Sequence, residues 1–301
     1  MSIERTPASF GPIGMVGLGN MGLPMSTHMI AAGFRVIGTA RTEKSREALR
    51  AVGGESVEGV KEIAEKCHYI ILALSSIPVF REITAQLAEL CPAGTVIIET
   101  GTFPIQEKET AKAAFDKKGV IMMDVPLSGT GEQAKHKDVV CFGSGDKDVY
   151  EEILPILKGF SKAQPYLGKF SNGMKMKFIA NQLVAIHNVS TAEAVLFAEK
   201  LGIDVREMIA AVGPGAGGSR MLDVRGPVMA DRSWATSQIT NRVFHKDMLM
   251  IAEALHESGC PSPLFSATIP IYTAAIAAGH AEDDTASVYA VLAKMCEPDG
   301  K

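Results

Sequence analysis

The chain has 301 residues, of which 47% are hydrophobic and 21% charged, and its formal net charge is −4. This balance is typical of an ordinary globular protein with room for two domains, and no basic block points to a nucleic-acid partner. No apolar run is long enough to cross a bilayer, and the first residues lack the apolar core of a signal peptide, so we expect no membrane partner.

Cysteine and histidine usage predicts a reducing compartment and no metal site. The five cysteines form no CxxC pair, which favours reduced thiols in the cytoplasm. The seven histidines show no ligand spacing such as HExxH, so the sequence gives little support to metal binding.

After an N-terminal tail, residues 1–12, which we expect to be flexible, residues 13–167 alternate β-rich runs with amphipathic helical patterns. Strands are predicted at 13–16, 35–40, 69–74, 96–100, 120–125 and 139–142. Helices are predicted between them at 21–32, 43–52, 60–66, 78–90, 104–118 and 147–158. Strands that alternate with helices need crossover connections, which predicts an α/β fold with a doubly wound, mostly parallel sheet of the Rossmann type.

The first predicted strand runs directly into a glycine-rich loop, Gly17-Leu18-Gly19-Asn20-Met21-Gly22, that opens the first predicted helix. A dinucleotide-binding fingerprint requires this context. Gly17 permits the tight turn, Gly19 lets the pyrophosphate approach the backbone, and Gly22 allows close helix packing. The helix N-terminus supplies N–H groups and positive potential for the phosphates. The alternative is a purely structural turn, which the context disfavours.

The end of the second predicted strand favours NADP over NAD. NAD sites usually place an acid there to hold the ribose 2′-hydroxyl, whereas this chain has Arg41 and Thr42. Arg41 can pair with a 2′-phosphate and stack on the adenosine, and Thr42 can donate a hydrogen bond to the phosphate. The alternative is that Arg41 is a surface cation and Thr42 caps the next helix, although Thr42 can do both.

Further polar residues follow later strands, at the sheet edge where open α/β folds bind ligands. Leu74-Ser75 follows the third predicted strand and Thr102 the fourth, although either could equally be a helix cap. Residues 124–131, DVPLSGTG, leave another strand end with small and polar residues, namely Ser128, Gly129 and Thr130. Their hydroxyl groups and backbone amides can hold a carboxylate.

Strand signals stop after residue 167, and residues 168–301 are predicted to form an all-helical second domain for substrate binding and oligomerisation. One long helix begins near Gly173 and ends near Gly202. Further helices are predicted at 205–212, 218–224, 240–257, 264–278 and 285–294. The apolar character of these helices predicts a homodimer or homotetramer.

The long helix is apolar on most of its circumference, which predicts that it lies inside the molecule. Lys177 and Asn181 interrupt this surface one turn apart, and therefore on the same face. Because Lys177 lies in the first turns, burial and the positive end of the helix dipole both oppose its protonated form, so it is a candidate proton carrier. The alternative is that Lys177 reaches solvent beside Lys169 and Lys175.

Four ordered motifs resemble the β-hydroxyacid dehydrogenases, the superfamily of 3-hydroxyisobutyrate dehydrogenase and 6-phosphogluconate dehydrogenase. They are GLGNMG at 17–22, DVPLSG at 124–129, the helix with Lys177 and Asn181, and His245-Lys246-Asp247. The resemblance spans residues 13–292. It implies an NADP(H)-dependent oxidoreductase that transfers a hydride between the nicotinamide and a small β-hydroxy acid or its semialdehyde or keto form.

The resemblance also implies roles for matched residues. Lys177 would be the catalytic acid/base, and Asn181 would help to bind the substrate. Ser128 and Gly129 would hold the substrate carboxylate, while Thr102 and Lys246 would border the cofactor.

The chain departs from the family pattern near the expected substrate pocket. Thr130, Gln133 and Lys137 stand where glycines are usual, and residues 99–102 read ETGT where an acid followed by Ser-Thr is usual. The substrate therefore stays open among 3-hydroxyisobutyrate, tartronate semialdehyde, threonate and succinic semialdehyde-like acids. An imine reductase-like NADPH enzyme is one alternative, against which the presence of Lys177 argues. The other is a non-catalytic NADP-binding module, which predicts a degraded Ser128, Lys177 or Asn181.

Overall fold

The computed structural model describes residues 6–235 and 239–296, and the chain divides into two compact units. Unit 1 comprises Met1–Lys177 and unit 2 comprises Phe178–Lys301. The division falls inside the long helix, later than the expected boundary at residue 167, and the first turn of that helix is hydrogen-bonded to Ser144 and Asp124 of unit 1.

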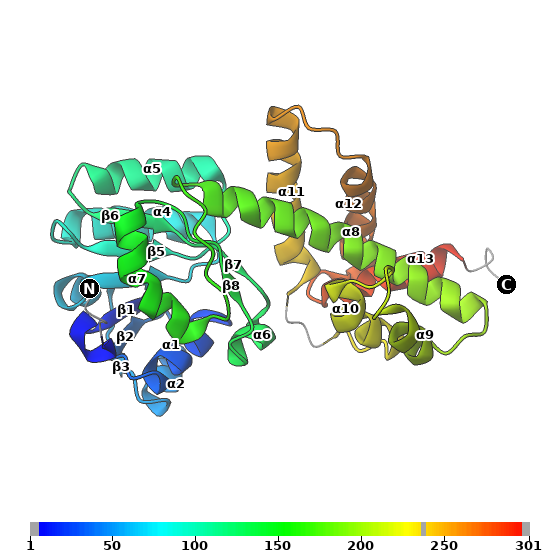
Figure 1. Ribbon diagram of the computed structural model, residues 1–301, viewed down its shortest axis with the longest axis horizontal. Helices are drawn as coiled ribbons and strands as arrows, with labels where there is room; N and C mark the ends of the chain where they lie inside the picture. Colours follow the sequence, from blue (N-terminus) through cyan, green and yellow to red (C-terminus); the bar gives the residue numbers. More distant parts are fainter. Residues whose placement is uncertain (1–5, 236–238, 297–301) are drawn as a thin grey trace. The chain divides into compact units, whose positions relative to one another are not determined.

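Unit 1 contains a six-stranded sheet with the strand order β3-β2-β1-β4-β5-β6 (Figure 1). The strands are β1 (Ile13–Val16), β2 (Val36–Thr39), β3 (Glu55–Ser56), β4 (Tyr69–Leu72), β5 (Val96–Glu99) and β6 (Ile121–Asp124). All five pairings are parallel, which confirms the predicted doubly wound fold. The chain moves outward from β1 to β3 and then places β4 on the other side of β1. The strand order therefore reverses beside β1, and such sheets bind ligands at the carboxyl ends of the strands there.

Helices cover both faces of this sheet, and each face has its own apolar core. One core is formed with α1 (Gly22–Ala31), α2 (Glu43–Ala51) and α7 (Lys147–Phe160). The other is formed with α3 (Val60–Lys66), α4 (Ile77–Leu90) and α5 (Ile105–Asp116). Burial on both faces explains why the central strands are continuous apolar runs without polar alternation.

Short elements of unit 1 differ from the sequence prediction. Pro7–Phe10 forms a 3₁₀ helix, and Phe10 is buried in the first core, so this part of the expected tail is structured. Residues 1–5 of that tail lie outside the described residues. β7 (Leu127–Ser128) pairs with β8 (Val140–Cys141) in a separate antiparallel sheet, so the strand predicted at 139–142 does not extend the main sheet.

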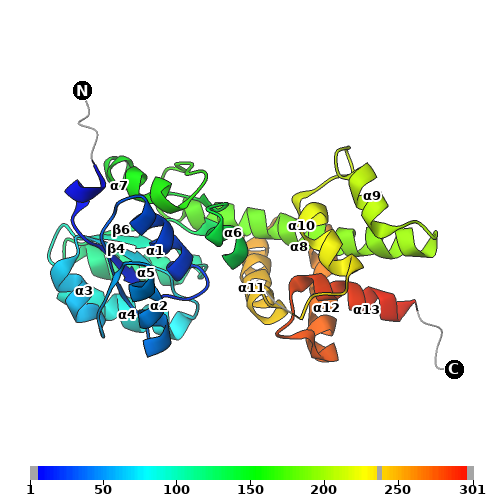
Figure 2. The same ribbon diagram turned by 90° about the horizontal axis from the view of Figure 1, so that it is seen from below.

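Unit 2 is helical throughout the part of it that the structure describes, as predicted. α8 (Asn172–Lys200) begins in unit 1 and continues into unit 2, where the later helices gather around it (Figure 2). These are α9 (Val205–Val212), α10 (Arg220–Ala230), α11 (Asn241–Glu257), α12 (Pro263–Ala275) and α13 (Val288–Met295). None of the described helices combines the length and apolar character needed to cross a membrane.

α8 is buried along one stripe only, so the prediction that it lies inside the molecule is wrong for its other sides. Ile179 and Leu183 are 52% and 48% exposed. The buried stripe instead contains polar side chains, among them Lys177, Asn181 and Asn188, which follow one another after four and seven residues and so share one side of the helix. Because apolar residues occur on every side of α8, their spacing does not identify the buried side.

Candidate active site

The glycine-rich loop joins β1 to α1 at the carboxyl end of the central strand. Gly17 has a φ of 100°, and a methyl group there would lie 2.4 Å from the Ala73 carbonyl oxygen. A methyl group on Gly22 would lie 1.9 Å from the Gly17 carbonyl oxygen, so the turn and the helix can pack only with glycine there. A methyl group on Gly19 would meet no protein atom within 4 Å. This open space fits the close approach of a pyrophosphate to the backbone.

The rest of the glycine-rich loop contacts the segment that follows β7. Leu18 is buried in the core, Asn20 is exposed, and Met21 is the N-cap of α1. A methyl group on Gly131 would lie 3.1 Å from the Asn20 carbonyl oxygen. The predicted phosphate-binding loop and the start of α6 (Gly131–Lys135) are therefore in direct contact.

Arg41 and Thr42 follow β2 at the same edge of the sheet, and both are exposed. Thr42 caps α2, because its Oγ1 accepts a hydrogen bond from the backbone N–H three residues later, at 3.3 Å. Glu43, the next residue, places a carboxylate close to the predicted 2′-phosphate site. Hydrogen bonds from Arg50 and Arg46 hold the pKa of Glu43 below its usual value. Since two arginines bind this carboxylate, it repels a 2′-phosphate less than a lone carboxylate would.

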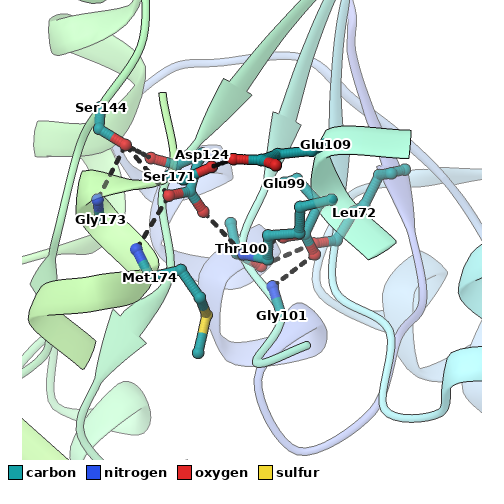
Figure 3. Close-up of polar contacts among 11 residues, drawn as sticks. Leu72, Glu99, Thr100, Gly101, Glu109, Asp124, Ser144, Ser171, Gly173 and Met174 are labelled. Atoms are coloured by element: carbon teal, nitrogen blue, oxygen red, sulfur yellow. Dashed lines mark hydrogen bonds and ion pairs between the residues drawn. The ribbon is translucent and has the colours of Figure 1, made fainter. Parts of the chain in front are cut away.

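The ends of β4 and β5 are held together at this edge. Leu74 and Ser75 follow β4, and Thr102 follows β5. Thr100 Oγ1 donates a hydrogen bond of 2.7 Å to the last carbonyl group of β4, and a methyl group on Gly101 would lie 3.1 Å from the Leu74 carbonyl oxygen (Figure 3). The N-caps of α4 and α5 are other residues, so neither Ser75 nor Thr102 is the helix cap of the alternative interpretation.

The predicted carboxylate-binding loop follows β6. Ser128 ends β7 and is half-buried, and Gly129 has a φ of 141° that favours glycine. Thr130 caps α6 in a capping box: its N–H donates to Gln133 Oε1 at 2.9 Å, and its Oγ1 accepts from Gln133 N–H at 3.3 Å. The Thr130 amide is therefore engaged by the cap. Lys137, which stands where a glycine is usual in the family, has a φ of 58°. It therefore adopts a left-handed backbone conformation that favours glycine.

The first turn of α8 is tied to the end of β6 (Figure 3). Asp124 Oδ2 accepts a hydrogen bond from the Met174 N–H, and Ser144 Oγ accepts one from the Gly173 N–H, each at 2.9 Å. The Asp124 carboxylate offsets part of the positive end of the helix dipole, and the dipole acts mainly on the first turn. Lys177 lies beyond that turn, so the dipole influences it less than the sequence suggests.

Lys177 and Asn181 are both buried on the same side of α8, with exposed fractions of 8% and 5%. Lys175, two residues earlier, is exposed. The alternative interpretation requires Lys177 to extend into solvent. Its burial contradicts that interpretation. A lysine that is largely buried is a candidate to exchange a proton with a bound substrate.

Asp247 of α11 is a residue to which the sequence assigned no role. Asn181 Nδ2 donates to Asp247 Oδ2 at 3.2 Å, and Lys246 Nζ lies 3.3 Å from Asp247 Oδ1. This buried carboxylate therefore orients both Asn181 and Lys246, the residues expected at the substrate and the cofactor. The only sequence signal was its place in the His245-Lys246-Asp247 motif.

These residues can bind phosphates, bind a carboxylate and carry a proton. The glycine-rich loop offers backbone groups to phosphates, the Ser128–Gly129 segment offers donors to a carboxylate, and Lys177 offers an amine. Within residues 6–235 and 239–296, no group of three or more His, Cys, Asp or Glu side chains could hold a metal ion.

Two family models match almost the whole chain. Residues 12–169 match the NAD binding domain of 6-phosphogluconate dehydrogenase. Residues 171–292 match the model described as NAD-binding of NADP-dependent 3-hydroxyisobutyrate dehydrogenase.

One curated relative is similar to this chain in sequence, and two solved structures share its fold. A chloroplastic glyoxylate/succinic semialdehyde reductase 2 of Arabidopsis thaliana is 26% identical over 287 residues, which cover 93% of this chain and 79% of the relative. The crystal structure of a 3-hydroxyisobutyrate dehydrogenase from Salmonella typhimurium is 23% identical, with a TM-score of 0.85 over 93% of this chain and 99% of that one. The structure of Psf3 in complex with NADP+ and 2-OPP is 20% identical, with the same TM-score and coverage. Since the family models cover both units, this chain belongs to the β-hydroxyacid dehydrogenases, the superfamily of 3-hydroxyisobutyrate dehydrogenase and 6-phosphogluconate dehydrogenase, and is an NAD(P)-dependent enzyme of that family.

Proposed function

We propose that this enzyme is NADP(H)-dependent and interconverts a small β-hydroxy acid with its semialdehyde or keto form, with Lys177 as the general acid/base. The observation that carries the proposal is the burial of Lys177, which shares its side of α8 with Asn181. The same helix is hydrogen-bonded at its start to Asp124, four residues before Ser128 in the predicted carboxylate-binding loop.

The proposed mechanism divides the work between the cofactor and the chain. When bound, the nicotinamide accepts or supplies the hydride. Ser128 and Gly129 bind the substrate carboxylate, and Asn181 hydrogen-bonds the substrate with its amide oriented by Asp247. In oxidation, the hydroxyl-bearing carbon loses a hydride while neutral Lys177 Nζ takes the hydroxyl proton. In reduction, the protonated amine returns that proton to the carbonyl oxygen, so charge and protons balance in both directions.

A substrate panel tests this proposal. The panel contains 3-hydroxyisobutyrate, threonate, tartronate semialdehyde and succinic semialdehyde, each followed by nicotinamide absorbance with the NADP and NAD couples. We expect turnover of at least one compound, with a higher kcat/KM for the NADP couple. Tight NADPH binding without turnover of any of these acids would favour the non-catalytic module. Reduction of a cyclic imine in place of these acids would favour the imine reductase alternative.

The NADP preference depends on Arg41. Arg41→Ser should lower kcat/KM for NADPH by roughly 10- to 100-fold, because a charged hydrogen bond to a phosphate contributes about 1.5–3 kcal/mol. The variant should leave kcat/KM for NADH nearly unchanged. Arg206→Ser is the matched control, because Arg206 is also exposed but pairs with Asp231 in unit 2. Equal losses with NADPH and NADH would contradict a role for Arg41 at the 2′-phosphate.

A homodimer or homotetramer is proposed from the exposed apolar side chains of unit 2. Among the large apolar residues that are exposed in the described structure, all but Leu90 and Met176 lie in unit 2, and Phe197 and Leu264 are 64% and 68% exposed. Surfaces of this kind mark association sites in many proteins. Light scattering should give a multiple of the 32.0 kDa chain mass, and the mass of a single chain would contradict the proposal.

The cytoplasm is the proposed location. Its support is that Cys67, Cys91, Cys141, Cys260 and Cys296 are all free thiols, as expected in a reducing compartment. Fractionation of cells that express the chain would test it.

A further inference from the structure

A lysine in α5 is wholly buried between two carboxylates. The side chains of Lys108, Glu99 and Asp124 are each 0% exposed. Lys108 Nζ lies 2.7 Å from Asp124 Oδ1 and 2.5 Å from Glu99 Oε2. Burial opposes the charge on Lys108, but Asp124 and Glu99 outweigh it and raise the pKa of the lysine above its ordinary value. Lys108 is therefore a buried cation at neutral pH.

The two carboxylates connect this cation to three segments of the active site. Glu99 Oε1 accepts a hydrogen bond from the Gly101 N–H at 2.7 Å, directly before Thr102. Asp124 ends β6 and leads into the Ser128 loop. Its second oxygen, Oδ2, accepts from the Met174 N–H, so the same carboxylate also reaches the first turn of α8 (Figure 3).

Two hydroxyl groups add to the attachment of α8. Ser144 Oγ donates to Asp124 Oδ2 at 3.0 Å and accepts from the Gly173 N–H at 2.9 Å. Ser171 Oγ donates to Glu109 Oε1 at 3.1 Å, and Glu109 follows Lys108 in α5 (Figure 3). The start of α8 is thus attached to α5 both through Asp124 and through Glu109.

Lys177 follows Met174 by three residues and Gly173 by four, which places it one helical turn after the attached amides. A change in the attachment of that turn therefore changes where the Lys177 amine lies relative to Ser128 and Thr102. A displacement of about 1 Å in a catalytic group can cost ~100-fold in rate.

We propose that Lys108 is a positioning residue, which acts through Asp124 and Glu99 to hold the first turn of α8, and so the Lys177 amine, in register with the Thr102 and Ser128 segments. The proposal rests on the proposed function of Lys177. A buried ion cluster is often no more stabilising than apolar residues of the same size, because desolvation of the charges opposes their attraction. The position of the first turn of α8 therefore explains this cluster better than a gain in folding stability does.

The test uses a double variant, Lys108→Met with Glu99→Gln, which removes the buried cation and replaces the Glu99 carboxyl group, whose pKa burial raises, with a neutral amide of the same shape. Amide hydrogen exchange at Gly173 and Met174 should become at least ~10-fold faster, because their acceptors are less firmly held. With the substrate that the panel identifies, kcat should fall by roughly 10- to 100-fold, while KM for NADPH stays within about twofold of the wild-type value. Assays are run well below the melting temperature of each variant.

The matched control is Lys118→Met, because Lys118 pairs with Glu89 at the surface of the same unit. It should leave both exchange and kcat unchanged. If the double variant does not fold, Ser144→Ala carries the test, since it removes the hydroxyl link between Asp124 and Gly173 without a change in charge. It should raise exchange at Gly173, whose acceptor is lost, and at Met174, whose acceptor Asp124 is less firmly held, and it should lower kcat.

Two outcomes would overturn the proposal. One is a folded variant with wild-type exchange at Gly173 and Met174. The other is faster exchange with wild-type kcat, which would make the cluster a helix attachment without influence on Lys177. A wild-type chain that turns over no hydroxy acid would be a failure of the proposed function instead, and the exchange comparison would still decide whether Lys108 holds α8.

Discussion

Replacement of Lys177 by alanine is expected to lower kcat for hydroxyacid oxidation by about 10³-fold, while the affinity for NADPH stays within about twofold of the wild-type value. The loss follows because no other group is proposed to take the hydroxyl proton as the hydride leaves. NADPH binding should persist, because the glycine-rich loop and the β2 end that are proposed to hold it do not include Lys177. Single-turnover kinetics and NADPH fluorescence titration measure the two effects separately.

Two further variants separate proton transfer from other roles of the lysine. Lys177→Arg keeps the positive charge but cannot lose a proton near neutral pH, so it should be as impaired as the alanine variant. Lys175→Ala removes an exposed lysine from the same helix and should retain wild-type kcat. Because oxidation needs the neutral amine, kcat/KM for oxidation should rise with pH in the wild type, and this rise should vanish in Lys177→Ala. Near wild-type turnover by Lys177→Arg would assign the lysine an electrostatic role and remove proton transfer from the mechanism.

The main features of unit 1 could be predicted because their signals are local. β1 and its glycine-rich loop adjoin in the sequence, and the helix Val60–Lys66 was predicted with the bounds that the structure gives. The two-residue strands β3 and β7 carry no periodic pattern, since their existence depends on partners distant in the chain. α6 was missed although its capping-box residues, Thr130 and Gln133, are visible in the sequence.

The orientation of α8 could not be read from the sequence for a different reason. A helix with apolar residues on every side offers no preferred buried stripe, and the actual stripe includes Lys177, Asn181 and Asn188. Partners elsewhere in the chain help to bury such side chains, as Tyr272 and the Thr285 carbonyl group do when they accept hydrogen bonds from the Asn188 amide nitrogen. Such partners are set by the tertiary fold, so spacing along one helix cannot reveal them.

Lys108 shows the same limit in unit 1. It shares a helical stripe with the buried Ala111 and Phe115, and this spacing was the one available signal of its burial. A lysine in such a pattern is ordinarily interpreted as exposed, because desolvation of its charge is costly. Its two carboxylates come from β5 and β6, so only the folded sheet brings the compensating charges together.

Replacement of Gly19 by valine is expected to weaken NADPH binding by ~100-fold or more without loss of stability in the cofactor-free enzyme. A Cβ at this position meets no protein atom within 4 Å, and the backbone there is not left-handed, so the folded chain can accept the side chain. The same branched side chain would fill the space into which a pyrophosphate must come to reach the loop amides. NADPH titration and denaturant unfolding of the cofactor-free protein measure the two effects.

Gly22→Ala supplies the contrast, because its methyl group would lie 1.9 Å from the Gly17 carbonyl oxygen and must displace the turn itself. That variant should lose NADPH affinity and also unfold more easily, by about 1–3 kcal/mol, as overpacked sites do. If the loop were only a structural turn, Gly19→Val would bind NADPH as the wild type does, and only Gly22→Ala would show a defect, in stability. Loss of binding at both positions with loss of stability only at Gly22 therefore separates the phosphate-binding role of the loop from its structural role.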